Sequence, residues 1–283
     1  MSLTAKSLPT IALPDGTRVA QLGQGTWRMG ERAGARADEI AAIRRGIELG
    51  LTLVDTAEMY GDGGAELMLG EALRGSRDQV FLVSKAYPQN GGGAALQRAC
   101  ESSLKRLATD RLDLYLLHWR GAVPLGQTVE GMTRLQAAGK IRHWGVSNFD
   151  VDDLEELWRA GGAACASNQI LYNLARRGPE FALLPWMAKR QCPAMAYSPV
   201  EQGRLPKSGP LATVARRHEA TIFQVALAWL LRRSDTIVIP KAATLAHVEA
   251  NRAALDLRLD ADDLKALDAA FAPPGRKEPL AMI

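Results

Sequence analysis

The feature that most constrains the fold is a regular alternation of short apolar runs with amphipathic stretches along 283 residues. Each apolar run has the length of a buried strand, and each stretch between two runs has helical spacing of its apolar residues. Parallel strands need crossover connections, which helices usually supply. The expected strands cover residues 21–25, 51–54, 80–83, 112–117, 141–146, 166–170, 194–197 and 236–239.

The stretches between these runs carry start and stop signals of helices. Asp150 and Thr128 have side chains that can cap the first turn of the helix that follows. A glycine ends several stretches, as expected for a helix terminus. These glycines are Gly50, Gly75, Gly139 and Gly161. The expected helices cover residues 37–49, 65–73, 94–107, 129–138, 151–160, 180–189 and 223–232.

Eight such strand–helix units in a chain of this length predict an α/β fold of the closed (β/α)8 barrel type. The rival is a doubly wound open sheet, which usually carries a glycine fingerprint after its first strand. The segment Gly23-Gln-Gly25 lacks the third glycine of that fingerprint. We find no linker, low-complexity segment or internal repeat, so residues 1–283 are expected to form a single domain.

Two segments fall outside the alternation. Residues 11–19 are two short apolar pieces joined by Asp15-Gly16, a strong hairpin signal. This N-terminal β-hairpin is expected to cap one end of the barrel. Residues 260–271 are expected to form a final surface helix, followed by a C-terminal tail.

Composition is ordinary for a globular protein, with 47% hydrophobic and 23% charged residues and a formal charge of +4. Lysine and arginine are dispersed, which argues against a nucleic-acid partner. Cys100, Cys165 and Cys192 are too far apart to suggest a disulfide framework or a metal site. The start lacks a signal peptide, and the most apolar helix, residues 222–231, is too short to span a membrane. We expect a cytoplasmic monomer.

Three successive strand runs end in residues capable of proton chemistry. Asp55 and Tyr60 follow the second run, Lys85 ends the third, and His118 ends the fourth. In a barrel these ends converge on one mouth. A phenol has an ordinary pKa near ~10, and we expect the Lys85 ammonium to lower the pKa of Tyr60, with Asp55 holding that lysine charged. Such a group suits reduction of a carbonyl, whose developing alkoxide needs a proton donor.

With these residues in place, the chain resembles the aldo-keto reductases over nearly its whole length. The matching segments are Gly23-Gln-Gly-Thr-Trp27, Asp55-Thr-Ala-Glu-Met-Tyr-Gly61, Ser84-Lys-Ala-Tyr-Pro88, Asp113-Leu-Tyr-Leu-Leu-His-Trp119, Gly145-Val-Ser-Asn-Phe149, Asn168-Gln169, Tyr197-Ser-Pro199 and Ile239-Pro-Lys241.

The resemblance implies a barrel that binds NADPH across its mouth and reduces aldehydes or ketones, with Asp55, Tyr60, Lys85 and His118 as catalytic residues. It implies that Ser147, Asn148 and Gln169 hold the nicotinamide amide and that Tyr197 stacks on the ring. The other implied cofactor contacts are Gly25, Thr26, Trp27, Asp55, Ser198, Pro199, Val200, Gly203, Ile239, Pro240, Lys241, Ala242, His247 and Asn251. The implied substrate pocket contains Trp27, Met59, Tyr87, His118, Trp119 and Arg120.

The chain departs from the family pattern at the adenosine end. Ala242 and His247 stand where the family often has serine and arginine, and Ala250 where it often has glutamate. Lys241 remains as a point-charge partner for the 2′-phosphate, so NADPH is expected and NADH is possible. Arg120 stands where the family usually has proline, and it either favours anionic substrates or points into solvent.

Two other functional classes remain open at this stage. A cofactor-sensing protein of the same fold would bind NADPH with negligible turnover. A metal-dependent hydrolase on a barrel would need ligand spacing among His118, His143, His218 and His247, and the chain shows none. No metal site is therefore expected.

Overall fold

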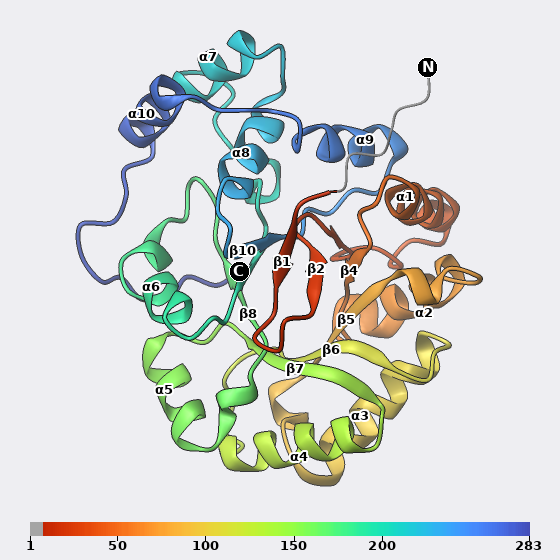
Figure 1. Ribbon diagram of the computed structural model, residues 1–283. Helices are drawn as coiled ribbons and strands as arrows, with labels where there is room; N and C mark the ends of the chain where they lie inside the picture. The colour runs from red at the N-terminus through yellow and green to blue at the C-terminus, as the bar shows by residue number, and fades with distance from the viewer. Residues whose placement is uncertain (1–7) are drawn as a thin grey trace.

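In the computed structural model, which describes residues 8–283, eight parallel strands form one sheet in the order β3 to β10 (Figure 1). Each strand pairs with its neighbour in the chain, which confirms the predicted α/β barrel with crossover helices. The strands are β3 (Gln24–Gly25), β4 (Leu53–Asp55), β5 (Phe81–Ala86), β6 (Leu112–Leu117), β7 (Ile141–Ser147), β8 (Asn168–Leu171), β9 (Ala194–Tyr197) and β10 (Thr236–Val238).

The sheet closes on itself where the first strand meets the last. Parallel bridges join Leu22 to Val238 and Gly25 to Lys241. The Gly25 amide donates to the carbonyl of Pro240 at 3.0 Å. A Cβ at position 25 would lie 2.9 Å from the carbonyl oxygen of Ile239, so a side chain there would push the closing strands apart.

Helices surround the sheet, as Figure 1 shows. Asp150 caps its helix through a capping box with Asp153, as the sequence predicts. The prediction that Thr128 starts a helix is wrong, because the helix begins one turn earlier, directly after Pro124. The helices are α1 (Arg36–Glu48), α2 (Gly64–Ala72), α3 (Gly93–Arg106), α4 (Leu125–Ala137), α5 (Val151–Arg159), α6 (Leu183–Ala188), α7 (Pro210–Arg217), α8 (Ile222–Leu231), α9 (Leu245–Ala253) and α10 (Ala261–Ala270).

The sequence pattern did not predict α7, an additional helix before α8, or α9, the short helix that follows β10. It placed the glycines correctly, since all four end their segments with a left-handed φ between +70° and +90°. None of the helices in residues 8–283 combines the length and apolarity that crossing a bilayer requires.

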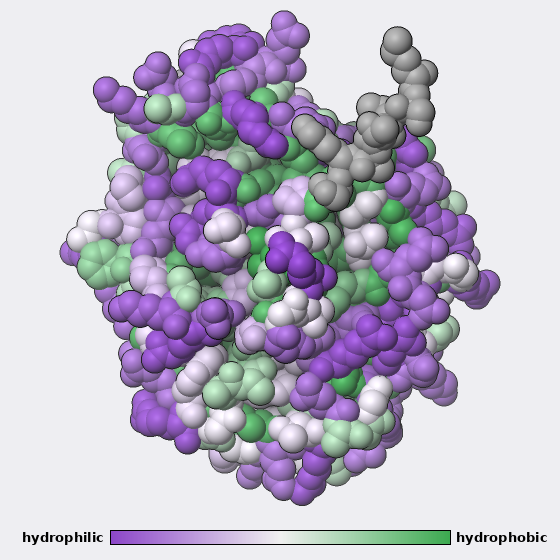
Figure 2. Space-filling view, viewed as in Figure 1, coloured by the Kyte–Doolittle hydropathy of each residue, from purple (hydrophilic) through white to green (hydrophobic). Residues whose placement is uncertain are grey.

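The N-terminal hairpin, β1 (Thr10–Ala12) and β2 (Arg18–Ala20), lies across the barrel end that faces the viewer in Figure 1. Its apolar side chains, such as Ile11 and Val19, pack into the barrel interior against Leu53, Leu114 and Met195. Figure 2 shows mostly polar side chains on this face, with apolar ones in small separate groups. The hairpin therefore plugs the amino-terminal end of the strands, which leaves the carboxyl-terminal end for a site.

Candidate active site

A cavity of about 1160 Å³ lies at the carboxyl-terminal ends of the strands. This end of a (β/α)8 barrel is where strand-end side chains converge. The residues expected in the site that do line the cavity are Gly25, Thr26, Trp27, Asp55, Met59, Tyr60, His118, Trp119, Ser147, Asn148, Gln169, Tyr197, Ser198, Pro199, Val200, Gly203, Ile239, Pro240, Lys241, His247 and Asn251.

Three of the residues expected to be catalytic form one hydrogen-bonded group at the bottom of this cavity. Asp55 ends β4, Lys85 lies on the neighbouring strand β5, and Tyr60 begins the short helix η2 (Tyr60–Gly63). The Lys85 ammonium donates to Asp55 Oδ2 at 2.8 Å and to the carbonyl of Thr56 at 2.7 Å. It lies 3.1 Å from the Tyr60 hydroxyl. Lys85 is fully buried, so its charge is balanced only by the groups that it touches.

Burial is the largest single influence on the proton affinity of each of these three residues, but it does not set the net direction for Lys85. It opposes the charge on Lys85, but Asp55 and Tyr60 more than offset it and raise the pKa of that ammonium above its ordinary value. Burial raises the pKa of the Asp55 carboxyl, with Lys85 opposing the rise. Burial also raises the pKa of the Tyr60 phenol. The expectation of a lowered Tyr60 pKa is therefore wrong in its net direction, although Lys85 does act to lower it.

His118 directly follows β6 and lies beside the phenol. Its ring centroid is 5.9 Å from that of Tyr60, with the two planes at 75°. Burial, together with the nearby Lys85 ammonium, lowers the pKa of His118 to about 3. The imidazole is therefore neutral near pH 7 and can donate one hydrogen bond without carrying a charge. Within residues 8–283, its Nδ1 is buried and has no hydrogen-bond partner.

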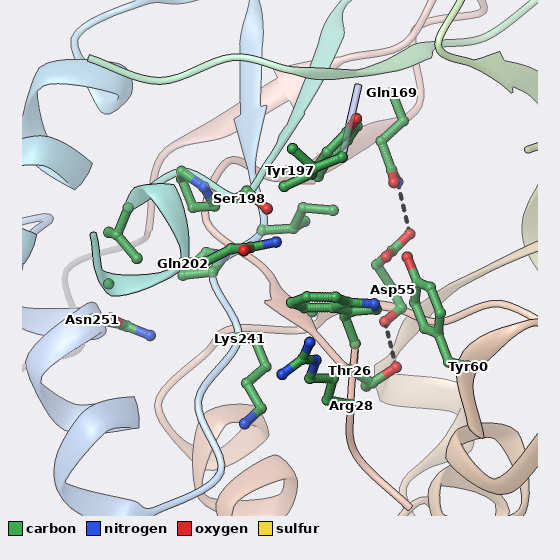
Figure 3. A pocket seen from close by; sticks show the side chains of 18 of the residues that line it. Thr26, Arg28, Asp55, Tyr60, Gln169, Tyr197, Ser198, Gln202, Lys241 and Asn251 are labelled. Atoms are coloured by element: carbon green, nitrogen blue, oxygen red, sulfur yellow. Dashed lines mark hydrogen bonds between the residues drawn. The ribbon is translucent and has the colours of Figure 1, made fainter. Parts of the chain in front are cut away.

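A second group of polar side chains lines the opposite wall of the cavity. It is hydrogen-bonded to the group of Asp55, Lys85 and Tyr60. Figure 3 shows Gln169 pointing at Asp55, and its amide donates to Asp55 Oδ1 at 2.7 Å. Ser147 donates to the backbone carbonyl of Gln169 at 2.9 Å. Asn148 donates to the carbonyl of His118 at 3.1 Å and accepts from the Tyr197 hydroxyl at 2.9 Å. The four residues thus form a prearranged set of amide and hydroxyl groups above the buried triad.

The far end of the cavity is positively charged and includes residues that the sequence analysis missed. Lys241 lines it, and so does Arg28, whose guanidinium lies 4.5 Å from the centroid of the Trp27 ring. Figure 3 shows the side chains of Arg28 and Lys241 on one side of the cavity, with Gln202 across from them. Arg28 directly follows an expected strand-end segment, so the strand-end signal could have found it.

Other lining residues had a weaker signal or none. Thr221, Phe223 and Gln224 lie at the start of α8, where Thr221 and Gln224 form a capping box that can be read from the sequence. Met282 and Ile283 line the cavity from the C-terminal tail, whose path no local pattern predicts.

Four residues expected in the site do not line the cavity. Arg120 donates to both carboxylate oxygens of Glu156 on α5, at 2.8 and 3.3 Å, so its charge is paired outside the cavity. Tyr87 packs edge-on against Trp119. Ala242 is buried beside the lining residue Lys241. Lys85 also lies behind the lining, where it contacts Asp55 and Tyr60. Within residues 8–283, no cluster of three or more histidine, cysteine or acidic side chains is arranged to hold a metal ion.

Comparisons with known proteins identify similar sequences and structures. The family model described as the aldo/keto reductase family matches residues 21–272. Methylglyoxal reductase YeaE of Escherichia coli (strain K12) is 53% identical over 268 residues, which cover 93% of this chain and 94% of that protein. A crystal structure of an aldo/keto reductase from Klebsiella pneumoniae with NADP and acetate is 51% identical, with a TM-score of 0.95 over 98% of this chain and 100% of that one. The thermostable aldo-keto reductase Tm1743, solved with the inhibitor epalrestat, is 35% identical, with a TM-score of 0.88 over 93% of this chain and 99% of that one.

Proposed function

Since the chain belongs to the aldo/keto reductase family, we propose that it reduces aldehydes and ketones to alcohols, with NADPH as the hydride donor. The observation that carries the proposal is the buried group of Asp55, Lys85 and Tyr60 beside a neutral His118 at the bottom of the cavity. This group has a proton donor, a charge that stabilises the phenolate, and a neutral hydrogen-bond donor. Those are the parts that reduction of a carbonyl requires.

The cavity suits an extended dinucleotide. Its volume of about 1160 Å³ exceeds that of a usual pocket for one small ligand, and it runs from Tyr60 to the cations Arg28 and Lys241. Amide and hydroxyl groups of Asn148 and Gln169 match a carboxamide, and cations match phosphates. A bound nicotinamide would supply the hydride. The lining residues Ser147, Asn148, Gln169 and Tyr197 would hold it, and Arg28 and Lys241 would meet the phosphates.

Residues of the protein then bind and protonate the carbonyl oxygen of the substrate. His118 donates a hydrogen bond to that oxygen from its neutral ring. Tyr60 gives it a proton as negative charge develops there. The raised pKa keeps the Tyr60 phenol protonated at neutral pH, so it has a proton to donate. The Lys85 ammonium, 3.1 Å away, stabilises the phenolate that remains.

A small dicarbonyl such as methylglyoxal is the proposed substrate. The relative with 53% identity is a methylglyoxal reductase. The space beside Tyr60 and His118 is lined by Trp27, Met59 and Trp119, which are large apolar side chains with no free charge. Because Arg120 is paired with Glu156, the lining gives no reason to expect a preference for anionic substrates.

The test is turnover by the purified chain. When wild-type protein is mixed with NADPH and methylglyoxal, the absorbance of NADPH should decrease in proportion to the alcohol formed. NADH should be used less efficiently. Tight NADPH binding without turnover over a panel of aldehydes, ketones and dicarbonyls would instead support the cofactor-sensing alternative.

Three expectations from the sequence belong to the same proposal: a cytoplasmic location, a monomeric state and a single domain over residues 1–283. The three cysteines are free and buried, which suits a reducing compartment. Light scattering coupled to gel filtration would test the oligomeric state, and a single cooperative unfolding transition would support one domain.

A further inference from the structure

The loop after β9 contains a buried carboxylate that the proposed chemistry does not use. Glu201 lies in the short helix η7 (Glu201–Gly203) and is only 6% exposed. Its neighbours Val200 and Gln202 line the cavity, whereas Glu201 does not. Its carboxylate instead meets residues of the loop that follows β8, so it joins the wall of the cavity to a neighbouring segment.

Two side chains from that loop hold the carboxylate. Nε and Nη2 of Arg176 donate to Glu201 Oε1 at 3.1 and 2.9 Å. The side-chain amide of Asn173, which is fully buried, donates to Glu201 Oε2 at 2.8 Å. The same amide nitrogen donates to the backbone carbonyl of Ser198 at 2.8 Å. One asparagine therefore ties both ends of the segment from 198 to 201, and we call Glu201, Asn173 and Arg176 the latch.

The backbone of this segment needs such support. Ser198, Glu201 and Gln202 have φ values of +47°, +50° and +54°, in the left-handed region that residues with a Cβ rarely adopt. Conformations of this kind persist where the surrounding contacts impose them. The latch supplies contacts at two of these three positions, because Ser198 and Glu201 are the residues that Asn173 holds.

The latch is charged at neutral pH. Burial tends to raise the pKa of the Glu201 carboxyl, but hydrogen bonds from Arg176 and Asn173 outweigh it and hold that pKa below its ordinary value. Arg204 adds a more distant cation, 3.7 Å from Oε1. The charge-assisted hydrogen bonds are therefore present under assay conditions, and they are stronger than neutral ones.

We propose that Glu201 is a positioning residue, which with Asn173 and Arg176 fixes the loop after β9 as one wall of the cofactor groove and thereby slows cofactor release. The inference rests on the proposed function, because it requires a nicotinamide cofactor in the cavity. Gln202 faces the cations Arg28 and Lys241 across that cavity (Figure 3), and Gly203 also lines it, so a loop that moves would open the groove at its phosphate end.

The test compares NADPH binding by the full chain in the wild type, Glu201→Ala, Arg176→Ala and the double variant. Stopped-flow tryptophan fluorescence would give the association and dissociation rates. Each single variant should raise the Kd about tenfold, mainly through faster dissociation, as most changes at a binding surface do. The double variant should be no worse than Glu201→Ala alone, because the loss of Glu201 already breaks the contact with Arg176.

Glu156→Ala is the matched control. It breaks the Glu156–Arg120 pair, which is another arginine–carboxylate contact near the barrel mouth but lies away from the loop after β9. Its NADPH dissociation rate should match the wild type within about twofold. Glu201→Gln keeps an acceptor oxygen for Asn173 and should recover part of the lost affinity.

Steady-state kinetics separates positioning from a general structural role. In Glu201→Ala the KM for NADPH should rise while the KM for the carbonyl substrate stays constant. The proposal is refuted if both single variants release NADPH at the wild-type rate although the wild type binds NADPH. It is also refuted if kcat and the apparent affinities for both NADPH and the carbonyl substrate decrease together with a lower Tm. If the wild type binds no NADPH, the proposed function itself fails. Arg176 is about half exposed, so Arg176→Ala provides the test even where Glu201→Ala does not fold.

Discussion

The amide of Gln169 and the ammonium of Lys85 bind the two oxygens of one carboxylate, that of Asp55, at 2.7 and 2.8 Å. Lys85 comes from the strand next to Asp55, whereas Gln169 reaches it from β8, on the other side of the barrel. The residue expected to hold the cofactor amide is thus also bound to the carboxylate that we propose to be catalytic. Under that proposal, cofactor binding and proton chemistry share this contact.

Replacing Gln169 should therefore change the pH dependence of the reaction as well as cofactor affinity. The Gln169 hydrogen bond lowers the pKa of the Asp55 carboxyl, so Gln169→Leu removes that effect and the pKa rises further. Protonation of Asp55 would remove the counter-charge of Lys85, so the acidic limb of the kcat/KM profile should move to higher pH. Profiles measured at saturating NADPH would show this, and identical acidic limbs would contradict it.

Tyr60→Phe should remove the proton donor while leaving the ring in place. We expect kcat to fall by roughly 10²–10⁴-fold, the usual contribution of general acid catalysis. The Kd for NADPH should change by less than about threefold, because the hydroxyl mainly contacts Lys85 in this site. Single-turnover reduction of methylglyoxal would measure the chemical step. A variant with wild-type rates would show that another group gives the proton.

His118 predicts a loss of stability in acid. Its pKa falls from the ordinary 6.5 to about 3 in the folded protein, because of burial and Lys85. Between these pH values the unfolded chain takes up a proton that the folded chain does not. The neutral ring therefore favours folding above pH 6.5, and this advantage is lost as the pH drops toward 3, by at most about 1.4 kcal/mol per unit.

Urea unfolding of the wild type and His118→Gln at several pH values would measure this slope. The variant cannot take up that proton, so the free energy of unfolding should decrease less steeply in acid. Parallel pH profiles of stability in the two proteins would mean that His118 is not the group responsible.

Arg120 should have little effect on the choice between neutral and anionic substrates. Its guanidinium is bound by Glu156 and by backbone carbonyls of Gly121 and Val123, outside the cavity. Arg120→Gln should change kcat/KM for methylglyoxal and for a keto acid by the same small factor, about twofold or less. Glu156→Gln is the control. A selective loss of activity toward the keto acid in Arg120→Gln would show that Arg120 interacts with anionic substrates after all.

Lys241 and His247 should set the preference between the two nicotinamide cofactors. Lys241→Met should raise the KM for NADPH about tenfold or more and leave that for NADH nearly unchanged, since only NADPH has the 2′-phosphate. His247→Arg should act in the opposite direction, because a guanidinium adds a permanent charge. Equal effects on both cofactors would place the 2′-phosphate elsewhere.

Much of the fold was predictable because the barrel has a local signature. The eight strands lie where the apolar runs predict them, within a few residues, and the hairpin forms around Asp15-Gly16. Buried parallel strands are mostly apolar, as in β6, in which all residues from Leu112 to Leu117 are buried and only Asp113 is charged. Two helices were missed: α7 is an additional helix between β9 and α8, and α9 follows β10, where the sequence has only the Thr244 cap as a local signal.

For the site, the sequence alone determined which chemical groups meet. Asp55, Tyr60, Lys85 and His118 follow or end successive parallel strands, and parallel strands in a barrel deliver such residues to one end. Local order is enough for that inference. The tertiary structure decided how those groups behave. Gln169 reaches Asp55 across 114 residues of chain, and Glu156 takes Arg120 out of the cavity across 36. Burial outweighs Lys85 and raises the pKa of Tyr60. Solvation and charge pairing depend on neighbours in space, and those neighbours exist only once the barrel has closed.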